Sequence, residues 1–383
     1  MIEAKAFIEA AMSAGIRHYS GVPCSFLKPL INGVIDHPDT EYVGAANEGD
    51  AVAIASGFAI AGYPSVALMQ NSGLGNAVSP LTSLNWVFGL PILLIVTWRG
   101  NPQHGDEPQH ELMGAITTDM LEAMDIEWAM FPEDQQAIGP ALEKAQQSMQ
   151  SRHKPFAFFV RKGSISPQPL QSTQRPSRMG HRFASTDFRQ KNPEARPSRQ
   201  QVLATVQQLA GPRDVLIATT GYTGRELYAL SDEPNQLYVV GSMGCASSLG
   251  LGLALADPGR RVFVLDGDGA ALMRMGNMAT IGQLGPANLV HVLIDNERHE
   301  STGGQSTVSA GVDFAHVATS CGYSAAVTGD NTDLIAPLLK LDLDGPRLAH
   351  IKVSPGAPDD LPRPTVKPPE VLARLRTFLE NSQ

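Results

Sequence analysis

Polar residues with metal-binding chemistry follow two apolar stretches in the second half of the chain. Asp268 stands between Gly267 and Gly269 at the end of the stretch RVFVLDG, and Asp295-Asn296 follows LVHVLI. If both stretches are parallel strands, they return these oxygen donors to the ligand-binding edge of one sheet. Mg2+ takes oxygen ligands and is held by one or two protein groups together with phosphate oxygens. Asp268, the Asn296 amide oxygen and one backbone carbonyl therefore predict a magnesium site beside a diphosphate.

A second segment has the pattern of a phosphate-binding turn. ATTGYTGREL places Thr219, Thr220 and Gly221 between a strand and a helix. Backbone N–H groups and the helix dipole at such a position receive phosphate.

A carboxylate in the first half could act as an acid or a base. Glu48 stands near the start of the helical stretch NEGDAVAIASGFAIAG, which follows the strand-like EYVGAA. Asp50 and Glu41 are rivals for this role. The structural alternative is an acidic residue that stabilises the helix dipole.

These residues must be positioned by strands that alternate with helices. The apolar stretches of the first half are HYSGVP, EYVGAA, SVALMQ, PILLIVTW, EWAMF and FAFFVRK; those of the second are DVLIATT, QLYVVG, RVFVLDG, LVHVLIDN, SAAVTG and RLAHIKV. This alternation predicts an α/β protein whose parallel sheets are flanked by helices. Each half opens with a similar helical stretch that ends at Gly, at Gly15 and at Gly211.

The domain boundaries follow from composition. Residues 164–197 are rich in Pro, Ser, Gln and Arg and poor in aliphatic residues, which is typical of a linker. We therefore expect one α/β domain over residues 1–163, a linker over 164–197 and a second α/β domain over 198–383.

Charge and hydropathy exclude several classes of partner. The net charge is −9 without a basic stripe, so a nucleic-acid partner is not expected. No apolar run approaches the ~20 residues that span a bilayer. The first residues lack a basic segment followed by a cleavable apolar stretch, so we expect a cytoplasmic protein.

The motif from Gly267 to Asn296, GDGAALMRMGNMATIGQLGPANLVHVLIDN, resembles the binding motif of the thiamine diphosphate (ThDP) enzymes. The resemblance implies ThDP and Mg2+ as cofactors, with Asp268, Asn296 and the Arg298 carbonyl as metal ligands. Asp295 departs from the family, which has Asn there. GSMG similarly implies that Met243, after Gly241 and Ser242, supports the bound cofactor.

The same family carries a glutamate at the place of Glu48, which implies that Glu48 activates the cofactor through its aminopyrimidine ring. NSGLGNAVSPL resembles the turn that lines the family's active site, which adds Asn71, Ser72 and Gly73 to the expected cofactor contacts. In this family, domains of different subunits face each other. The resemblance therefore implies a homodimer or larger homo-oligomer with active sites at the subunit interface.

Four segments narrow the resemblance to the phosphonopyruvate and sulfopyruvate decarboxylases: GVPCSFLKPL, RGNPQHGDEPQHELMG, FVRKGSISP and HESTGGQST. This subgroup lacks the third domain of other ThDP decarboxylases, for which the chain has no room. In the sulfopyruvate enzymes the two domains are often split over two chains, whereas this chain contains both. The resemblance therefore favours phosphonopyruvate over sulfopyruvate as the anionic 2-oxo acid substrate. Candidate substrate-binding residues are Ser25, Lys28, Arg99, His104, His110, Arg298 and His299, although each could equally be a solvated surface residue.

His110 is the best candidate proton donor, because it follows the fourth predicted strand and histidine titrates near neutrality.

Two alternative functions remain. A nucleotide-binding enzyme would need GxGxxG, but GLGNAV lacks the third Gly and a clear acidic ribose partner. A non-catalytic subunit with the ThDP fold should have lost Glu48 or a metal ligand, and this chain retains both.

Overall fold

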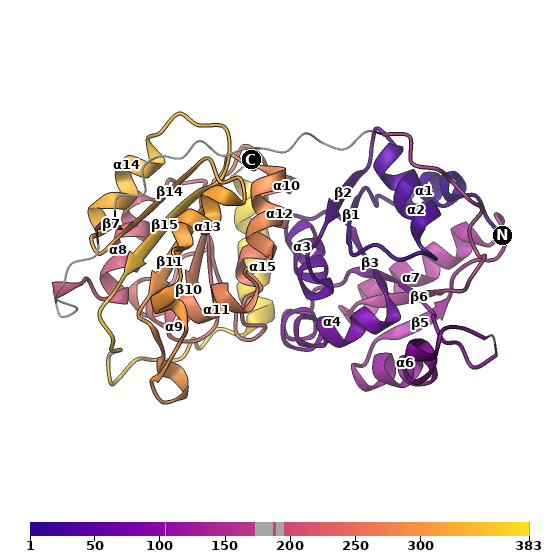
Figure 1. The fold of residues 1–383 in the computed structure, drawn as a ribbon, viewed down its shortest axis with the longest axis horizontal. Coiled ribbons are helices and arrows are strands. Elements are labelled where there is room, and N and C mark those ends of the chain that lie inside the picture. Colours follow the sequence, from indigo (N-terminus) through magenta and orange to yellow (C-terminus); the bar gives the residue numbers. More distant parts are fainter. Residues whose placement is uncertain (104, 173–186, 189–194, 383) are drawn as a thin grey trace. The chain divides into compact units, whose positions relative to one another are not determined.

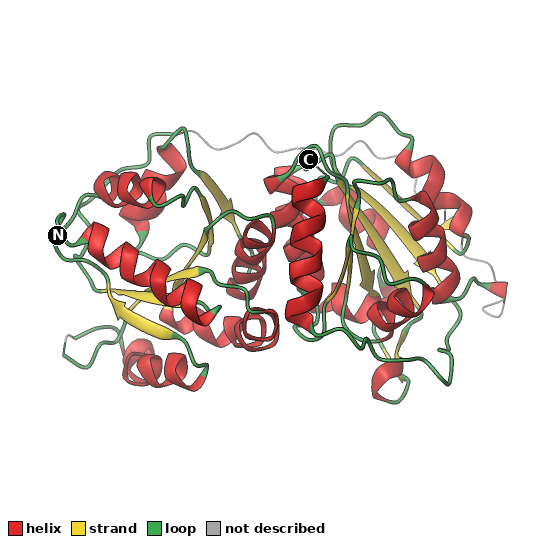
Figure 2. Cartoon of the chain, turned by 180° about the vertical axis from the view of Figure 1, so that it is seen from behind, coloured by secondary structure: helices red, strands yellow, loops and turns green. Residues whose placement is uncertain are grey.

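The computed structural model describes residues 1–103, 105–172, 187–188 and 195–382. The chain divides into two compact units, residues 1–175 and 176–383. Most of the expected linker, residues 164–197, lies outside the described residues. In each unit, helices lie on both sides of a sheet (Figure 1 and Figure 2).

The first unit is built on a six-stranded sheet with the order β2-β1-β3-β4-β6-β5, in which every pair of neighbours is parallel. Its strands are β1 (His18–Gly21), β2 (Glu41–Gly44), β3 (Ser65–Gln70), β4 (Leu93–Thr97), β5 (Glu127–Met130) and β6 (Phe156–Val160). Strands β4 and β6 are buried along their whole length. Continuous burial matches their unbroken apolar sequences and is typical of a sheet covered on both faces.

The helices of the first unit are α1 (Ala4–Ser13), α2 (Lys28–Asp36), α3 (Glu48–Ile60), α4 (Leu74–Pro80), α5 (Trp86–Phe88), α6 (Glu111–Ala123) and α7 (Ile138–Arg152). Helix α1 packs against α2 and α7, and α3 packs against β1 and β3. A hydrophobic core that includes Phe7 of α1, Tyr19 of β1 and Phe158 of β6 lies between these helices and the sheet. The apolar faces of the helices thus fix the sheet whose carboxyl edge carries the candidate residues.

The second unit contains a seven-stranded sheet with the order β7-β14-β15-β11-β10-β8-β9, again parallel throughout. Its strands are β7 (Asp187–Phe188), β8 (Val215–Ala218), β9 (Gln236–Tyr238), β10 (Val262–Gly267), β11 (Leu289–Asp295), β14 (Ala325–Gly329) and β15 (Arg347–Lys352). A separate antiparallel hairpin joins β12 (Arg298–His299) to β13 (Gln305–Ser306).

The helices of the second unit are α8 (Arg199–Leu209), α9 (Tyr222–Leu230), α10 (Ala246–Ala256), α11 (Asp268–Met273), α12 (Asn277–Leu284), α13 (Phe314–Ser320), α14 (Ile335–Leu339) and α15 (Pro368–Asn381). Helix α10 packs on β10, α13 packs on β14 and β15, and α15 packs on β9. Among the described residues, no helix is both long and apolar enough to cross a membrane.

The two sheets share one plan. Numbered in chain order within each unit, and leaving aside the edge strand β7, both have the strand order 2-1-3-4-6-5. The predicted α/β class with two parallel sheets is therefore confirmed, and each of the twelve predicted apolar stretches contains a strand. The sequence did not predict β7 or the hairpin of β12 and β13.

One predicted helix ending is wrong. Gly15 follows α1 with φ +83°, as a glycine that ends a helix does. Helix α8 instead ends at Leu209. The next residue, Ala210, has an extended backbone, and Gly211 donates its N–H to Asp214 Oδ2 at 2.7 Å. The Gly211 N–H is therefore bonded to a side chain, and Gly211 does not end the helix in a left-handed conformation.

Candidate active site

The predicted metal ligands lie at one edge of the second sheet. Strands β10 and β11 are parallel neighbours, with Gly267 opposite Ile294, so Asp268 and Asn296 follow strand ends that lie side by side. Asp268 opens α11 and is 3% exposed, and Asn296 is also buried. Burial raises the pKa of the Asp268 carboxyl, and the negative charge of nearby Asp295 raises it further. A buried carboxylate needs a compensating positive charge, and a divalent cation would supply it.

The rest of the donor set also fits magnesium. Among the described residues, no group of three His, Cys, Asp or Glu gathers to hold a metal ion. Mg2+ is typically bound by one or two carboxylates, with other oxygen atoms completing its coordination. One carboxylate, one amide oxygen and one carbonyl therefore remain an adequate predicted site.

A tight turn after β11 carries the other predicted ligands. Asp295 Oδ1 accepts a hydrogen bond from the Glu297 N–H at 2.9 Å, and Asn296 Oδ1 accepts one from the Arg298 N–H at 3.1 Å. Glu297 has φ +62°, a left-handed conformation that costs a non-glycine residue of order 1 kcal/mol. The two side-chain hydrogen bonds stabilise this turn, which brings Asn296 and Arg298 to the sheet edge.

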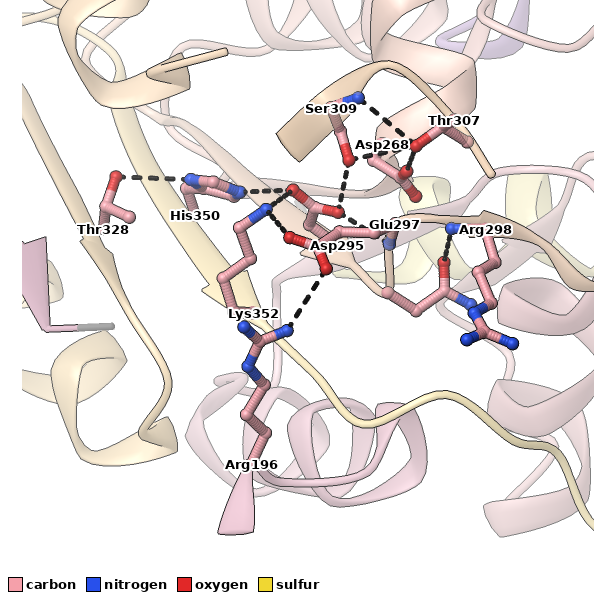
Figure 3. A network of polar contacts seen from close by, with 11 residues as sticks. Arg196, Asp268, Asp295, Glu297, Arg298, Thr307, Ser309, Thr328, His350 and Lys352 are labelled. Atoms are coloured by element: carbon pink, nitrogen blue, oxygen red, sulfur yellow. Dashed lines mark hydrogen bonds and ion pairs between the residues drawn. The ribbon is translucent and has the colours of Figure 1, made fainter. Parts of the chain in front are cut away.

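Asp295 anchors the turn from within the sheet (Figure 3). Its Oδ2 accepts hydrogen bonds from Lys352 Nζ at 2.7 Å and from His350 Nε2 at 2.9 Å, both on the neighbouring strand β15. Burial alone would raise the pKa of Asp295, but the His350 hydrogen bond and the Lys352 charge lower it. The aspartate that departs from the family's Asn is thus an anion paired with its own lysine.

A cavity of about 80 Å3 adjoins these residues. It is lined by Thr219, Thr220 and Gly221 after β8, by Met243, by Gly267, Asp268 and Gly269 after β10, and by Asn296, Arg298 and His299 after β11. The residues predicted to hold a diphosphate and its cation are therefore brought together. Gly241 and Ser242 precede Met243 in the turn beyond β9, and Ser242 is buried.

Two glycines shape this cavity. Gly221, the residue before α9, has φ +94°, a conformation that favours glycine. A Cβ on Gly269 would lie 2.6 Å from His299 Cε1 and 3.1 Å from Met243 Cε, so a larger residue would displace the cavity wall. Glycine at these two positions keeps side chains out of the cavity, which would allow a phosphate to approach the backbone.

Sequence reasoning missed a buried ion-pair group beside the cavity. Arg199, which lines the cavity, donates to Glu226 Oε1 at 2.6 Å and also pairs with Glu300. Burial raises the pKa of Glu226, and the Arg199 charge opposes this effect. No local motif marks these three residues, because they stand on separate elements and meet only in the fold.

In the first unit, Glu48 is the first residue of α3. The N-cap is Asn47, whose side chain accepts a hydrogen bond from the Gly49 N–H at 2.8 Å, so Glu48 is not needed as a cap. Glu48 Oε2 accepts a hydrogen bond from Asn76 Nδ2 at 2.8 Å. The Glu48 side chain also lies over Gly73, where an added Cβ would be 2.4 Å from Glu48 Cγ.

The rivals of Glu48 have other surroundings. Glu41 stands at the amino end of β2, where its carboxylate lies 3.3 Å from His18 Nδ1. Asp50 is buried within α3. Glu48 and Asp50 share the first turn of α3, but Glu48 is its first residue and is less buried than Asp50.

The turn after β3 contains the other expected cofactor contacts of this unit. Asn71, Ser72 and Gly73 form a single turn before α4. Asn71 is fully buried, and its Nδ2 donates to the Arg99 carbonyl at 2.8 Å and to Thr117 Oγ1 at 2.9 Å. It therefore holds the segment after β4 in place, and a direct contact with a cofactor stays a prediction.

Two predicted substrate residues meet after β1 and β4. Arg99 Nη1 donates to Ser25 Oγ at 3.4 Å, and its guanidinium lies 4.7 Å from the Phe26 ring centroid. Asp106 binds the same guanidinium through both carboxylate oxygens, at 2.6 and 2.7 Å, and this contact lowers the Asp106 pKa. Arg99 is thus held in one orientation with Nη1 directed toward Ser25.

Ser25 precedes a helix, and a prediction from the sequence that it starts this helix would be wrong. Helix α2 begins at Lys28 after the N-cap Leu27, so Ser25 lies in the preceding turn and offers its hydroxyl without the helix amides. The reason is local, because Pro29 suits the first turn of a helix and sets where α2 starts. Lys28 is exposed on the first residue of α2.

The predicted histidines fall in different places. His110 is buried at the start of α6, and His299 belongs to the cavity of the second unit. His104 lies outside the described residues. Asp106 accepts hydrogen bonds from the Arg99 side chain and from the Gly100 N–H. These contacts hold Asp106, four residues before His110, against the segment that follows β4.

Comparison with known proteins places these features in a family. Residues 2–123 match the thiamine pyrophosphate enzyme N-terminal TPP binding domain, and residues 220–353 match the C-terminal TPP binding domain. The chain is 42% identical over 99% of its length to a protein named phosphonopyruvate decarboxylase from Streptomyces viridochromogenes, of which 95% is covered. The chain belongs to the thiamine pyrophosphate enzyme family.

Other relatives agree. A phosphonopyruvate decarboxylase from Streptomyces hygroscopicus is 42% identical over 99% of this chain and 94% of that protein. A sulfopyruvate decarboxylase from Methanosarcina acetivorans is 28% identical over 97% of this chain and 96% of that protein. Because these full-length relatives are decarboxylases of one family, the chain is a ThDP-dependent decarboxylase.

A solved structure supports the fold. The Rhodococcus jostii RHA1 ThDP-dependent 4-hydroxybenzoylformate decarboxylase matches with a TM-score of 0.70 at 14% identity, covering 92% of this chain and 99% of that one. At this identity, the likeness shows the common fold only.

Proposed function

We propose that this enzyme uses ThDP and Mg2+ to decarboxylate phosphonopyruvate to phosphonoacetaldehyde and CO2. The observation that carries the proposal is 42% identity, over 99% of the chain, to two proteins named phosphonopyruvate decarboxylase. The fused arrangement of both domains in one chain is shared with a sulfopyruvate decarboxylase at 28% identity, which makes sulfopyruvate the second candidate substrate.

The second unit would hold the cofactor's charged end. The side chains of Asp268 and Asn296 and the carbonyl of Arg298 would bind Mg2+, and the turn at Thr219, Thr220 and Gly221 would receive the diphosphate. The cavity lined by these residues and the raised pKa of Asp268 support this assignment. When bound, ThDP supplies the carbon nucleophile and the ring that takes up electrons as CO2 leaves.

The first unit would supply the activating carboxylate and the anion recognition. Glu48 would accept a hydrogen bond from the cofactor's aminopyrimidine, with the Asn76 amide and Gly73 holding its side chain in place. Ser25, Lys28 and Arg99 would receive the substrate's phosphonate, and His104 and His299 are further candidates. His110 would return a proton to the carbon that loses CO2.

We further propose that the enzyme is at least a homodimer, with Glu48 of one subunit and Asp268 of another in a shared site. This arrangement is the family's, and most soluble oligomers are symmetric homo-oligomers.

Steady-state kcat/KM on phosphonopyruvate, sulfopyruvate and pyruvate, with ThDP and Mg2+ present, tests the substrate. Pyruvate leaves the phosphonate-binding donors unpaired, which can cost up to about 10⁴-fold in kcat/KM. Phosphonate and sulfonate differ by at most about one unit of charge, so only modest selectivity is expected between them. A clear preference for sulfopyruvate would support the second candidate, and pyruvate as the best substrate would overturn both.

A further inference from the structure

A bridge of two hydroxyl groups adjoins the predicted metal ligand Asp268 (Figure 3). Thr307 Oγ1 donates a hydrogen bond to Asp268 Oδ2 and accepts one from the Ser309 N–H at 3.4 Å. Ser309 Oγ in turn donates to Asp295 Oδ1 at 2.8 Å. Thr307 and Ser309 thus connect two buried carboxylates that follow neighbouring strands.

The two ends of this hydroxyl bridge differ in charge compensation. Asp295 is paired with Lys352, whose Nζ is 2.7 Å away and whose side chain is 2% exposed. The described residues place no positively charged side chain in an ion pair with Asp268, whose neighbouring charge is the carboxylate of Asp295. Asp295 therefore acts as a fixed, neutralised anchor, and Asp268 is the carboxylate left to bind a cation.

The backbone holds Thr307 in place. The Thr307 N–H donates to the Glu297 carbonyl at 3.0 Å, which closes the base of the β12 and β13 hairpin. Glu297 is itself paired with Lys352 Nζ at 2.8 Å. The hydroxyl that contacts Asp268 is thus fixed both through its own backbone and through Ser309.

We propose that Thr307 is a positioning residue for the cation ligand Asp268, acting in series with Ser309 and its anchor Asp295. This inference rests on the proposed function, in which Asp268 binds Mg2+. A carboxylate ligand whose second oxygen is held by a fixed donor needs no reorientation when the cation arrives. Loss of such an outer hydrogen bond typically weakens metal affinity about 10- to 100-fold.

The test measures Mg2+ affinity by calorimetric titration of the full-length protein at a fixed, saturating ThDP concentration. Thr307→Val keeps the side chain's shape and removes the donor, so its Mg2+ dissociation constant should rise about 10- to 100-fold. Thr307→Ser restores a hydroxyl and should stay within a few-fold of the wild type. Thr319→Val is the matched control, since the buried Thr319 hydroxyl donates only to the α13 carbonyls of Ala315 and His316.

The serial arrangement gives a second test. Ser309→Ala should weaken Mg2+ binding less than Thr307→Val does, and the double variant should match Thr307→Val alone. Unchanged Mg2+ affinity in Thr307→Val, or additive effects in the double variant, would overturn the inference. A wild-type protein that shows no Mg2+-dependent ThDP binding would instead contradict the proposed function, so the two failures are distinguishable.

Discussion

The two units have one strand order but carry different chemistry at the carboxyl edges of their sheets. After the second strand, the first unit has Glu48 at the start of α3, whereas the second unit has the turn around Met243 before α10. After the third strand, the first unit has the turn at Asn71, Ser72 and Gly73, whereas the second has Asp268. Under the proposed function, a shared scaffold supports an activating carboxylate in one copy and a cation-binding edge in the other.

The helices after the second strands show what the scaffold itself requires. Both α3 and α10 consist mostly of small and apolar residues and are buried from Gly49 to Ile60 and from Ala246 to Ala254. A helix that is apolar all round is a buried helix. The common architecture thus constrains these helices in both units, while the residues just before them are available for function.

The largest effect is expected at the cation-binding edge. Asp268→Ala should weaken ThDP binding in the presence of Mg2+ by more than about 100-fold, because even outer-shell partners of a metal cost 10- to 100-fold. Calorimetric titration with ThDP measures it. Asp232→Ala is the control, since Asp232 of the same unit forms a partly exposed ion pair with Arg374. Equal ThDP affinity in the Asp268 variant and the control would remove Asp268 from the site.

The matching change in the first unit should leave binding intact. Glu48→Gln should retain ThDP but lose about 10²- to 10⁴-fold in turnover, because an amide cannot replace the charged partner of the aminopyrimidine. Exchange of the ThDP C2 proton, followed by quenched NMR, should slow accordingly. Glu41→Gln, at the opposite end of β2, should exchange at the wild-type rate. A Glu48 variant with normal exchange would show that another carboxylate has this role.

A smaller effect is expected at Arg99, which separates substrate recognition from structural support. Arg99→Met should raise KM for phosphonopyruvate about 10- to 100-fold, since charge-assisted hydrogen bonds to an anion are lost. KM for pyruvate should change little. If Arg99 serves only to hold Asp106, the variant should instead lose thermal stability and show equal changes for both acids.

The smallest effect concerns packing around Glu48. In Gly73→Ala, the new methyl group would lie 2.4 Å from Glu48 Cγ, so the carboxylate must shift, at about 1–3 kcal/mol of stability. We expect a several-fold lower kcat with nearly unchanged ThDP affinity. Gly75→Ala in the same segment meets no atom within 4 Å and should keep the wild-type kcat. Equal kcat in both variants would mean that Gly73 does not hold Glu48.

Periodicity and local motifs predicted the sheets and the residues that directly follow their strands. Asp268 and Asn296 could be placed together because two apolar strands lead into them and neighbouring parallel strands end at one edge. Lys352 could not, because its contact with Asp295 depends on β15 pairing with β11, and strand order is not encoded locally. The sequence offers one signal for this contact. His350 and Lys352 are polar residues two positions apart in an otherwise apolar strand, which indicates buried partners on one face.

Hydroxyl and ion-pair partners from distant segments were also beyond sequence reasoning. Thr307 lies 39 residues from Asp268, in a hairpin too short to give a strand pattern. The bidentate Arg99–Asp106 pair was missed for another reason. Arg99 and Asp106 are seven residues apart in a loop, and such a spacing does not fix the relative orientation of two side chains.

Subunit complementation tests most directly whether the two units supply complementary halves of one active site. Glu48→Ala and Asp268→Ala chains, each inactive alone, would be mixed in equal amounts, dissociated, reassembled and assayed. If sites form between the first unit of one subunit and the second unit of another, roughly a quarter of wild-type activity should return, because half the dimers are mixed and each has one intact site. No recovery from mixtures that have reassembled into dimers would contradict this division of function.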